Sequence, residues 1–304
     1  MRIGIDIGGT KIEGVALDAS GGVAAALRVP TPQHDYAGTG AAVAHVVAVL
    51  EAETGTRATV GIGAPGSLSA RVDEHGERLW QGANATWLNG MPLAADLARA
   101  SNRDIRLAND ANCFAVSEAA DGAAAGAASV FGVILGTGVG GGLVVDGKPI
   151  EGRNGIAGEW GHIALPWQRA DEYPGRDCYC GRRGCIETWV AAKSLERDFA
   201  ERGGSRLNAT GIADAASAGE TLAAAVFDDY VDRLARGLAL IVDVVDPHVF
   251  VLGGGASRIA ALYDRLPPLI AGYAFAAAPE IAVVRNRHGD ASGVRGAAQL
   301  WPTS

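Results

Sequence analysis

The sequence predicts an α/β fold made of two lobes, and three observations support this. Short β-branched runs bounded by glycine alternate with longer helical patterns rich in Ala, Leu and Val, an order typical of folds that present ligands at strand ends. The length of 304 residues exceeds the ~100–200 residues usual for one domain. A strand, a glycine turn and a second strand occur at 3–18 and again at 133–146, so we expect each half of the chain to open with its own glycine hairpin.

Hydrophobic periodicity places the elements along the chain. Strands are predicted at 2–7, 13–17, 22–29, 59–63, 104–108, 129–135, 142–146, 248–252 and 281–285. Helices are predicted at 39–53, 93–101, 112–120, 187–201, 221–245, 257–271 and 293–301. The Ala/Gly-rich stretch 121–128 indicates a junction between a smaller lobe, 1–120, and a larger lobe, 121–290, although the end of an alanine-rich helix would have the same composition.

Charge and hydropathy exclude several classes of partner. The 26 Lys and Arg against 34 Asp and Glu give a net charge of -8 without a basic stripe, so neither nucleic acid nor an acidic membrane surface is expected as a partner. The N-terminal segment lacks the apolar core of a signal peptide, and no apolar run approaches the ~20 residues of a membrane span. We therefore expect a soluble, cytoplasmic protein that binds small ligands in a cleft between its lobes.

The two glycine turns, 8–10 and 136–138, are candidates for holding phosphate. Glycine permits positive φ values and leaves no Cβ between backbone N–H groups and an anion. Two such turns facing across a cleft would clamp a triphosphate, whereas each turn alone is more typical of an ordinary tight hairpin. Gly136, Gly138 and Gly141 also match the dinucleotide fingerprint, but 142–146 is predicted as a strand where a Rossmann loop needs a helix. An NAD-dependent oxidoreductase is therefore disfavoured, and the sequence contains no Walker A pattern.

A cluster of thiols is the clearest chemical signal in the chain. Cys178, Cys180 and Cys185 lie close together in sequence, and clustered thiols in a reducing cytosol indicate a metal rather than disulfides. Zinc prefers four tetrahedral nitrogen or sulfur ligands. His162 is the natural fourth ligand because the cluster lacks one, although a lone histidine is more often structural. The remaining thiol, Cys113, is predicted to be a buried helix residue.

Asp110 is the candidate general base. It lies between the strand predicted at 104–108 and the helix predicted at 112–120, where α/β folds present reactive groups to a cleft. Asn-Asp before a helix is also typical of an N-cap. The residues alone leave these two alternatives open.

Five motifs, in this order, resemble those of the ROK sugar kinases: Asp6–Lys11, Asn109–Asn112, Gly136–Gly142, Gly158–His162 and Cys178–Cys185. The resemblance extends over the whole chain. It implies an actin-like (ribonuclease H-like) two-lobe ATPase fold with a small zinc-binding insertion at 158–187. It also implies that the C-terminal helix, at about 291–304, packs back on the smaller lobe.

The resemblance also implies roles for individual residues. Asp110 would accept the proton of a sugar hydroxyl, and Asp6 would position Mg²⁺ through its waters. ATP would contact three glycine segments: Gly8, Gly9 and Thr10; Gly136, Thr137 and Gly138; Gly253, Gly254 and Gly255. The sugar would contact Gly66, Ser67, Asn84, Asn109, Asp110, Glu159, His162 and Glu187. Zinc would be held by His162, Cys178, Cys180 and Cys185, which would draw Glu159 and Glu187 to one side of the pocket.

Simpler explanations remain for some of these residues. Glu159 and Glu187 are also typical of surface charge, and Gly66-Ser67 after a proline is also typical of a turn.

The implied activity is ATP-dependent phosphorylation of a hexose at its 6-hydroxyl. Asn84–Gly90, Gly158–His162 and Ala291–Ala297 look closest to the fructokinase and mannokinase branch, so fructose is expected first, with mannose, glucose or N-acetylglucosamine behind it. The alternative is a non-catalytic, sugar-sensing regulator of the same family. Such regulators carry a winged-helix domain before the first phosphate strand, which here begins at residue 3. The family also suggests a homodimer.

Overall fold

A computed structural model of the chain describes residues 1–82 and 85–302. The chain divides into two compact units. The first comprises Met1–Gly126, Gly142–Ala157 and Asp290–Ser304, and the second comprises Ala127–Gly141 and Gly158–Gly289. Residues 142–157, which the sequence analysis assigned to the larger lobe, therefore group with the N-terminal residues.

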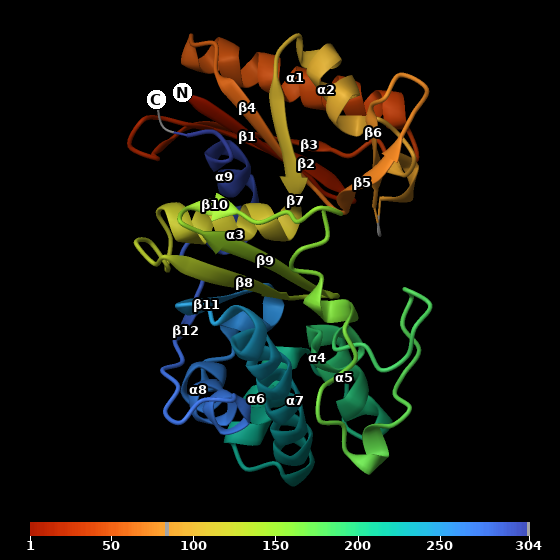
Figure 1. The fold of residues 1–304 in the computed structure, drawn as a ribbon, viewed down its shortest axis with the longest axis vertical. Coiled ribbons are helices and arrows are strands. Elements are labelled where there is room, and N and C mark those ends of the chain that lie inside the picture. Colours follow the sequence, from red (N-terminus) through yellow and green to blue (C-terminus); the bar gives the residue numbers. More distant parts are fainter. Residues whose placement is uncertain (83–84, 303–304) are drawn as a thin grey trace. The chain divides into compact units, whose positions relative to one another are not determined.

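The first unit is built on a five-stranded sheet whose strands are β1 (Arg2–Ile7), β2 (Lys11–Leu17), β3 (Val23–Pro30), β4 (Thr59–Ala64) and β7 (Ile105–Asn109). Their order is β3-β2-β1-β4-β7 (Figure 1). β1 pairs antiparallel with β2 and parallel with β4, which pairs parallel with β7. Because β1, β4 and β7 run in the same direction, their carboxyl ends lie at one edge of the sheet.

Helices cover both faces of this sheet (Figure 1). They are α1 (Tyr36–Thr54) and α2 (Leu93–Ser101) on one side, and α3 (Asp110–Ala120) and α9 (Ser292–Gln299) on the other. A Cβ on Gly4 would lie 2.0 Å from the Val294 carbonyl oxygen, and one on its register partner Gly61 would lie 1.8 Å from that of Ala297. These two glycines therefore let α9 pack directly on β1 and β4.

A second, small sheet in this unit was not predicted from the sequence. It consists of β5 (Ser67–Val72) and β6 (Arg78–Gln81), which pair antiparallel. None of the β5 side chains is fully buried, so the segment lacks the apolar alternation that marks a half-buried strand.

The second five-stranded sheet consists of β8 (Ser129–Leu135), β9 (Val139–Val145), β10 (Lys148–Pro149), β11 (Val249–Gly253) and β12 (Val283–Arg285). Its order is β10-β9-β8-β11-β12, and β11 pairs parallel with both β8 and β12. The unit boundary falls within β9. Phe131 makes edge contacts with Trp160 and Phe250 in the core of the second unit.

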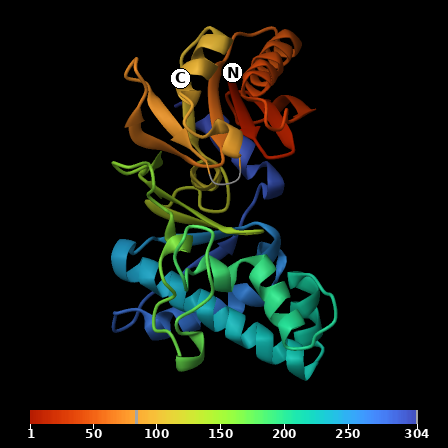
Figure 2. The same ribbon diagram turned by 90° about the vertical axis from the view of Figure 1, so that its right-hand side faces the viewer.

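The helices of the second unit pack together, as the green to blue ribbons of Figure 2 show. They are α4 (Glu187–Val190), α5 (Ala192–Glu201), α6 (Ala209–Ser217), α7 (Thr221–Val245) and α8 (Ala261–Tyr273). The bounds predicted for α7 are confirmed, whereas α6 was not predicted. Among the described residues, no helix is both long and apolar enough to cross a membrane.

The single helix predicted at 187–201 is wrong, because the structure divides it into α4 and α5. Ala191 between them has an extended backbone, with φ −60° and ψ 151°. The N–H of Ala192 donates to the carbonyl of Gly136 at 3.0 Å. Because this N–H is bonded outside the helices, α4 does not continue into α5. The same bond links the start of α5 to the second glycine turn.

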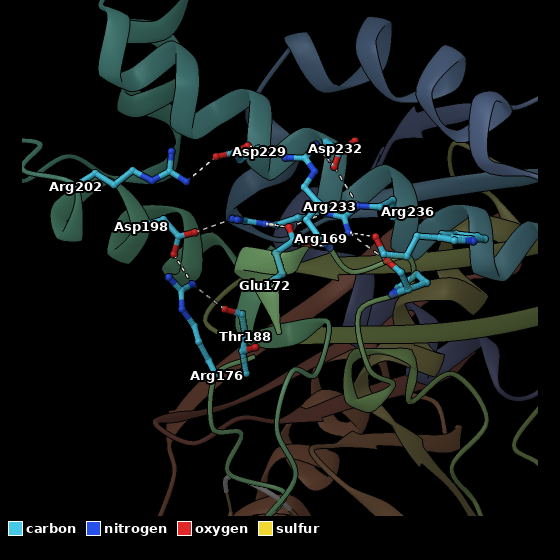
Figure 3. Close-up of polar contacts among 12 residues, drawn as sticks. Arg169, Glu172, Arg176, Thr188, Asp198, Arg202, Asp229, Asp232, Arg233 and Arg236 are labelled. Carbon is cyan, nitrogen blue, oxygen red and sulfur yellow. Dashed lines mark hydrogen bonds and ion pairs between the residues drawn. The ribbon is translucent and has the colours of Figure 1, made fainter. Parts of the chain in front are cut away.

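Buried ion pairs hold the segment that precedes the cysteine cluster (Figure 3). The Glu172 carboxylate accepts from Arg233 Nε at 2.8 Å and from Arg236 Nη2 at 2.7 Å. Both arginines lie on α7, three residues apart and on the same face. Arg233 also donates to Asp198 on α5 at 2.9 Å. The network therefore fixes the segment around Glu172 against two helices.

We expect Glu172→Gln to lower the free energy of unfolding by about 3–5 kcal/mol, because removing one partner of a buried ion pair leaves the other uncompensated. Burial alone would raise the pKa of Glu172, but hydrogen bonds from Arg236 and Arg233 outweigh it and hold the pKa at about 2. An unfolded glutamate has a pKa of about 4.3. The folded carboxylate therefore adds stability above about pH 4.3 that is lost as the pH falls toward 2.

Urea unfolding at pH 7, 5 and 3 measures both effects. The matched control is Asp171→Asn, at the exposed neighbouring position, which should stay within about 0.5 kcal/mol of the unchanged protein. If Glu172→Gln and the unchanged chain had equal stabilities and equal pH dependence, the Glu172 ion pairs would not stabilise the fold.

Candidate functional site

Three strand ends of the first unit bring together the residues predicted for phosphate binding and proton transfer. The turn Gly8–Thr10 follows β1, Gly66 and Ser67 follow β4, and Asn109 with Asp110 follows β7. Because these strands are parallel neighbours, the three segments meet at the same sheet edge. Asn84, also predicted here, lies outside the described residues.

The first glycine turn is a closed hairpin. Gly8 N–H donates to the Lys11 carbonyl at 2.9 Å, and a Cβ on Gly8 would lie 2.9 Å from that oxygen, whereas one on Gly9 would meet nothing within 4 Å. Thr31 Oγ1 donates to the Gly8 carbonyl at 2.7 Å, and Gln33 Nε2 donates to that of Gly9 at 2.7 Å. The carbonyl oxygens are thus satisfied within the protein, and the space above Gly9 is open.

Asp6 lies near Asp110 in a mostly buried environment. Burial, together with the nearby carboxylates of Asp110 and Glu13, raises the pKa of Asp6 to about 7, against a smaller opposing effect from Lys11. Two neighbouring carboxylates favour a hard divalent cation, which removes the repulsion between them. The donor set therefore fits Mg²⁺ or its bound waters.

The capping position of α3 is taken by Asn109. Its Oδ1 accepts from the N–H of Ala111 at 2.8 Å, and its Nδ2 donates to the carbonyl of Gly66 at 2.8 Å. Asp110 is the first residue of the helix, and its Oδ1 also accepts from Ala111 N–H, at 2.9 Å. A carboxylate can accept about four hydrogen bonds, and the bond to Ala111 is one of those that Asp110 accepts.

The second glycine turn is shorter than the glycine run suggests. Only residues 136–138 form the turn, and β9 begins at Val139. A Cβ on Gly141 would lie 2.5 Å from the Gly158 carbonyl oxygen, so close packing rather than ligand binding accounts for that glycine. The loop leads into a strand and not into the helix that a dinucleotide fold needs.

Glu187, predicted to bind sugar, contacts this second turn. Its Oε2 accepts from the N–H of Val139 at 2.9 Å, and a Cβ on Gly138 would lie 2.5 Å from the same oxygen. The third glycine segment is also near, because Gly253 on β11 pairs with Ile134 on β8. The second and third glycine segments are therefore neighbours within one unit.

The four predicted zinc ligands come together. Cys178 Sγ lies 3.6 Å from His162 Nδ1, Cys180 Sγ lies 3.7 Å from Cys185 Sγ, and all four ligand atoms lie within 4.8 Å of one another. Tetrahedral zinc, with bonds of about 2.3 Å to sulfur and 2.0–2.1 Å to nitrogen, requires S–S separations of ~3.8 Å and S–N separations of ~3.6 Å. The residues therefore fit zinc.

Two backbone contacts build this cluster. The N–H of Cys178 donates to the Arg182 carbonyl at 2.8 Å, which closes the turn that carries two of the thiols. Ala164 and Cys185 form an isolated antiparallel bridge, which brings the His162 segment alongside the third thiol.

His162 Nε2, the nitrogen that does not face the thiols, meets a tyrosine that the sequence analysis missed. Tyr179 Oη lies 3.0 Å from Nε2, and Glu159 Oε2 lies 4.0 Å from it. Burial raises the pKa of Glu159, the charge of His162 lowers it and that of Glu187 raises it, so both of these groups lie within electrostatic range of Glu159. The position of Tyr179 between two cysteines was the signal that could have revealed it.

Known proteins show the same pattern of sequence and fold. The sequence matches the ROK family over residues 2–304. This chain belongs to the ROK family. The N-acetyl-D-glucosamine kinase of Pectobacterium atrosepticum is 40% identical over 304 residues, covering 99% of this chain and 98% of that protein. That of Vibrio vulnificus is 37% identical over 304 residues, covering 99% of each.

Two solved ROK structures share the fold. The ROK hexokinase of Thermus thermophilus has a TM-score of 0.84 at 30% identity, covering 98% of this chain and 97% of that one. The Streptomyces griseus ROK glucokinase, in complex with glucose and AMPPNP, has a TM-score of 0.77 at 29% identity, covering 100% and 99%. The predictions of a ROK sugar kinase and of an actin-like α/β fold are confirmed. The prediction of fructose is less well supported than its alternative, because the relatives compared are N-acetylglucosamine kinases.

Proposed function

We propose that this ROK protein transfers the γ-phosphoryl group of ATP to a hexose hydroxyl, with Asp110 as general base. It is an ATP-dependent hexose kinase. The main support for this role is the position of Asp110 at the start of α3. There Asn109 is the helix cap, and Asp110 lies near the carboxylate of Asp6.

The residues of the first unit suit phosphoryl transfer, which depends on positioning and charge neutralisation more than on covalent chemistry. The turn Gly8–Thr10 would hold the transferred phosphoryl group, and Asp6 would hold Mg²⁺ through its waters. Asp110 would accept the proton of the attacking hydroxyl. Magnesium would supply charge neutralisation to the phosphates.

The residues of the second unit suit the recognition of ATP and sugar. The turn 136–138 and the segment 253–255 would contact ATP. Glu159 and Glu187 can each accept hydrogen bonds from sugar hydroxyls. His162 and the three cysteines would hold zinc, which would fix the loop that carries these groups.

The sugar itself is proposed from the relatives. Identity of 40% to an N-acetylglucosamine kinase over nearly the whole chain favours that sugar. Fructose or mannose is the second candidate, because Asn84–Gly90, Gly158–His162 and Ala291–Ala297 resemble the fructokinase and mannokinase branch. The cytoplasmic location and the homodimer stay predictions.

A coupled assay of ADP release with ATP, Mg²⁺ and a panel of hexoses tests the proposal. We expect turnover, with the highest kcat/KM for N-acetylglucosamine among N-acetylglucosamine, glucose, mannose and fructose. A clear preference for fructose or mannose would overturn the sugar assignment and leave the kinase intact. Sugar binding without turnover of any hexose would instead identify the non-catalytic regulator.

A further inference from the structure

The cysteine cluster has one member that faces solvent. All four cysteines of the chain lie in its described part, and Cys180 is exposed whereas Cys113, Cys178 and Cys185 are buried. An oxidant dissolved in water therefore meets Cys180 more readily than the other three. Ligation by zinc would keep this thiol deprotonated. Redox-sensing cysteines combine such exposure and thiolate character with a second thiol close by.

Cys185 is that second thiol. Its Sγ lies 3.7 Å from the Sγ of Cys180, whereas the Sγ of Cys178 lies 3.6 Å from His162 Nδ1. The hydrogen bond from the Cys178 N–H to the Arg182 carbonyl closes the turn that brings the first two together. This arrangement favours a disulfide between Cys180 and Cys185 over one that includes Cys178.

A disulfide between Cys180 and Cys185 and a zinc ion bound by both are mutually exclusive. Tetrahedral zinc holds two sulfur ligands ~3.8 Å apart, whereas the bond of a disulfide is about 2.05 Å long. The thiolate is the form that binds a metal, and a disulfide contains none. His162 and Cys178 would then be left as ligands, and two ligands do not meet the tetrahedral preference of zinc. Oxidation of this pair therefore releases the metal.

We propose that Cys180 and Cys185 form a reversible oxidation site, at which a peroxide converts the two thiolates to a disulfide and releases zinc from the loop. The Cys180 thiolate attacks one oxygen of hydrogen peroxide, the O–O bond breaks, and a sulfenic acid forms as hydroxide leaves. The Cys185 thiolate then attacks that sulfur, forms the S–S bond and expels a second hydroxide. Two thiolates are thus oxidised by one peroxide, and the metal leaves as Zn²⁺. A dithiol reductant reverses the step by thiol–disulfide exchange.

Release of zinc would loosen the segment proposed to bind sugar. The Ile186 N–H donates to the Ile163 carbonyl at 2.8 Å, so a backbone contact would still hold this segment after the metal has left. The side chains of Glu159 and His162 would lose the anchor that the metal provides. We therefore expect the oxidised protein to stay folded and to bind hexose more weakly, an effect that rests on the proposed function.

Hydrogen peroxide added to the zinc-loaded protein tests the site in the absence of sugar. A chromophoric zinc chelator should report the release of one zinc per chain. Tryptic mapping without reduction identifies the pair, because cleavage after arginine separates Cys185 from the peptide 177–182, which contains Cys178 and Cys180. We expect these two peptides to be joined through Cys180, with Cys178 free to be alkylated. Zinc retained after oxidation, any other pairing, or a sulfinic acid at Cys180 without a disulfide would overturn the proposal.

Calorimetric titration with hexose measures the consequence for the sugar site. The Kd should rise by about 30-fold on oxidation, because the sugar must then immobilise the loop side chains itself, and a reductant should restore it only when zinc is supplied as well. The matched control Cys113→Ala, which removes the buried thiol outside the cluster, should respond to peroxide as the unchanged protein does. Cys180→Ser lacks the attacked thiol, so peroxide should not change its hexose affinity further.

Two outcomes separate the oxidation site from the proposed function. If the oxidised, zinc-free protein stays folded in a circular dichroism melt and binds hexose as tightly as before, oxidation does not control the sugar site, and that part of the proposal is overturned. Failure of the reduced, zinc-loaded protein to bind any hexose would instead overturn the proposed function, while the zinc release and the mapped disulfide would still decide whether the oxidation site exists.

Discussion

Asp110→Asn should lower kcat by about 10²–10⁴-fold, the usual contribution of a general base, while the affinity for hexose changes little. The amide keeps the size and hydrogen-bonding capacity of the side chain but cannot take a proton at neutral pH. The helix should remain intact because its cap is Asn109, whose Oδ1 accepts from Ala111 N–H at 2.8 Å. Steady-state kinetics together with calorimetric binding of the sugar measures the two quantities separately.

The matched control for this substitution is Asp104→Asn. Asp104 is exposed and immediately precedes β7, so it carries the same chemical change at the opposite end of the same strand. It should leave kcat and stability unchanged. A kcat for Asp110→Asn within about tenfold of the unchanged enzyme would reduce Asp110 to a structural residue at the start of α3.

Cys180→Ser should remove zinc and weaken hexose binding by about 30-fold, with a much smaller effect on the affinity for ATP. Without the metal, the loop that carries Glu159, His162 and Tyr179 must be ordered by the sugar itself. Immobilising each such side chain costs about 0.5–1.5 kcal/mol, and a total near 2 kcal/mol corresponds to about 30-fold. The turn Gly8–Thr10 lies outside the zinc segment, so binding of the phosphates should largely persist.

Elemental analysis, calorimetry with hexose and with ATP, and a circular dichroism melt together test this result. Cys113→Ala removes the thiol outside the cluster and should keep one zinc per chain. A zinc-free but folded Cys180→Ser protein with unchanged hexose affinity would mean that the metal only stabilises the fold. Absence of zinc from the unchanged protein would contradict the metal assignment itself.

The close packing of backbone segments was not predictable from local sequence. The strand after the second glycine turn was predicted to begin at Gly142, but β9 begins at Val139 and includes Gly141 as well. A Cβ on Gly142 would lie 2.4 Å from the Ala111 carbonyl oxygen. Glycine therefore forms a turn at 136–138 and allows close backbone packing at 141 and 142. Only the segments that pack against these glycines distinguish the two uses.

The sequence by itself determined the family, the main strands and helices, and the set of candidate zinc ligands, because periodicity and motif spacing are local properties of the chain. It also determined that Asp110 lies at a strand-to-helix junction. The tertiary structure decided that Asn109 rather than Asp110 caps α3, because Asn109 has an extended backbone, with φ −62° and ψ 147°, and Asp110 is already the first residue of the helix. It decided as well that the free nitrogen of His162 faces Tyr179, and that Glu187 contacts the N–H of Val139. These contacts join residues 17 and 48 positions apart, and such pairings follow from the path of the folded chain, which spacing along the sequence does not specify.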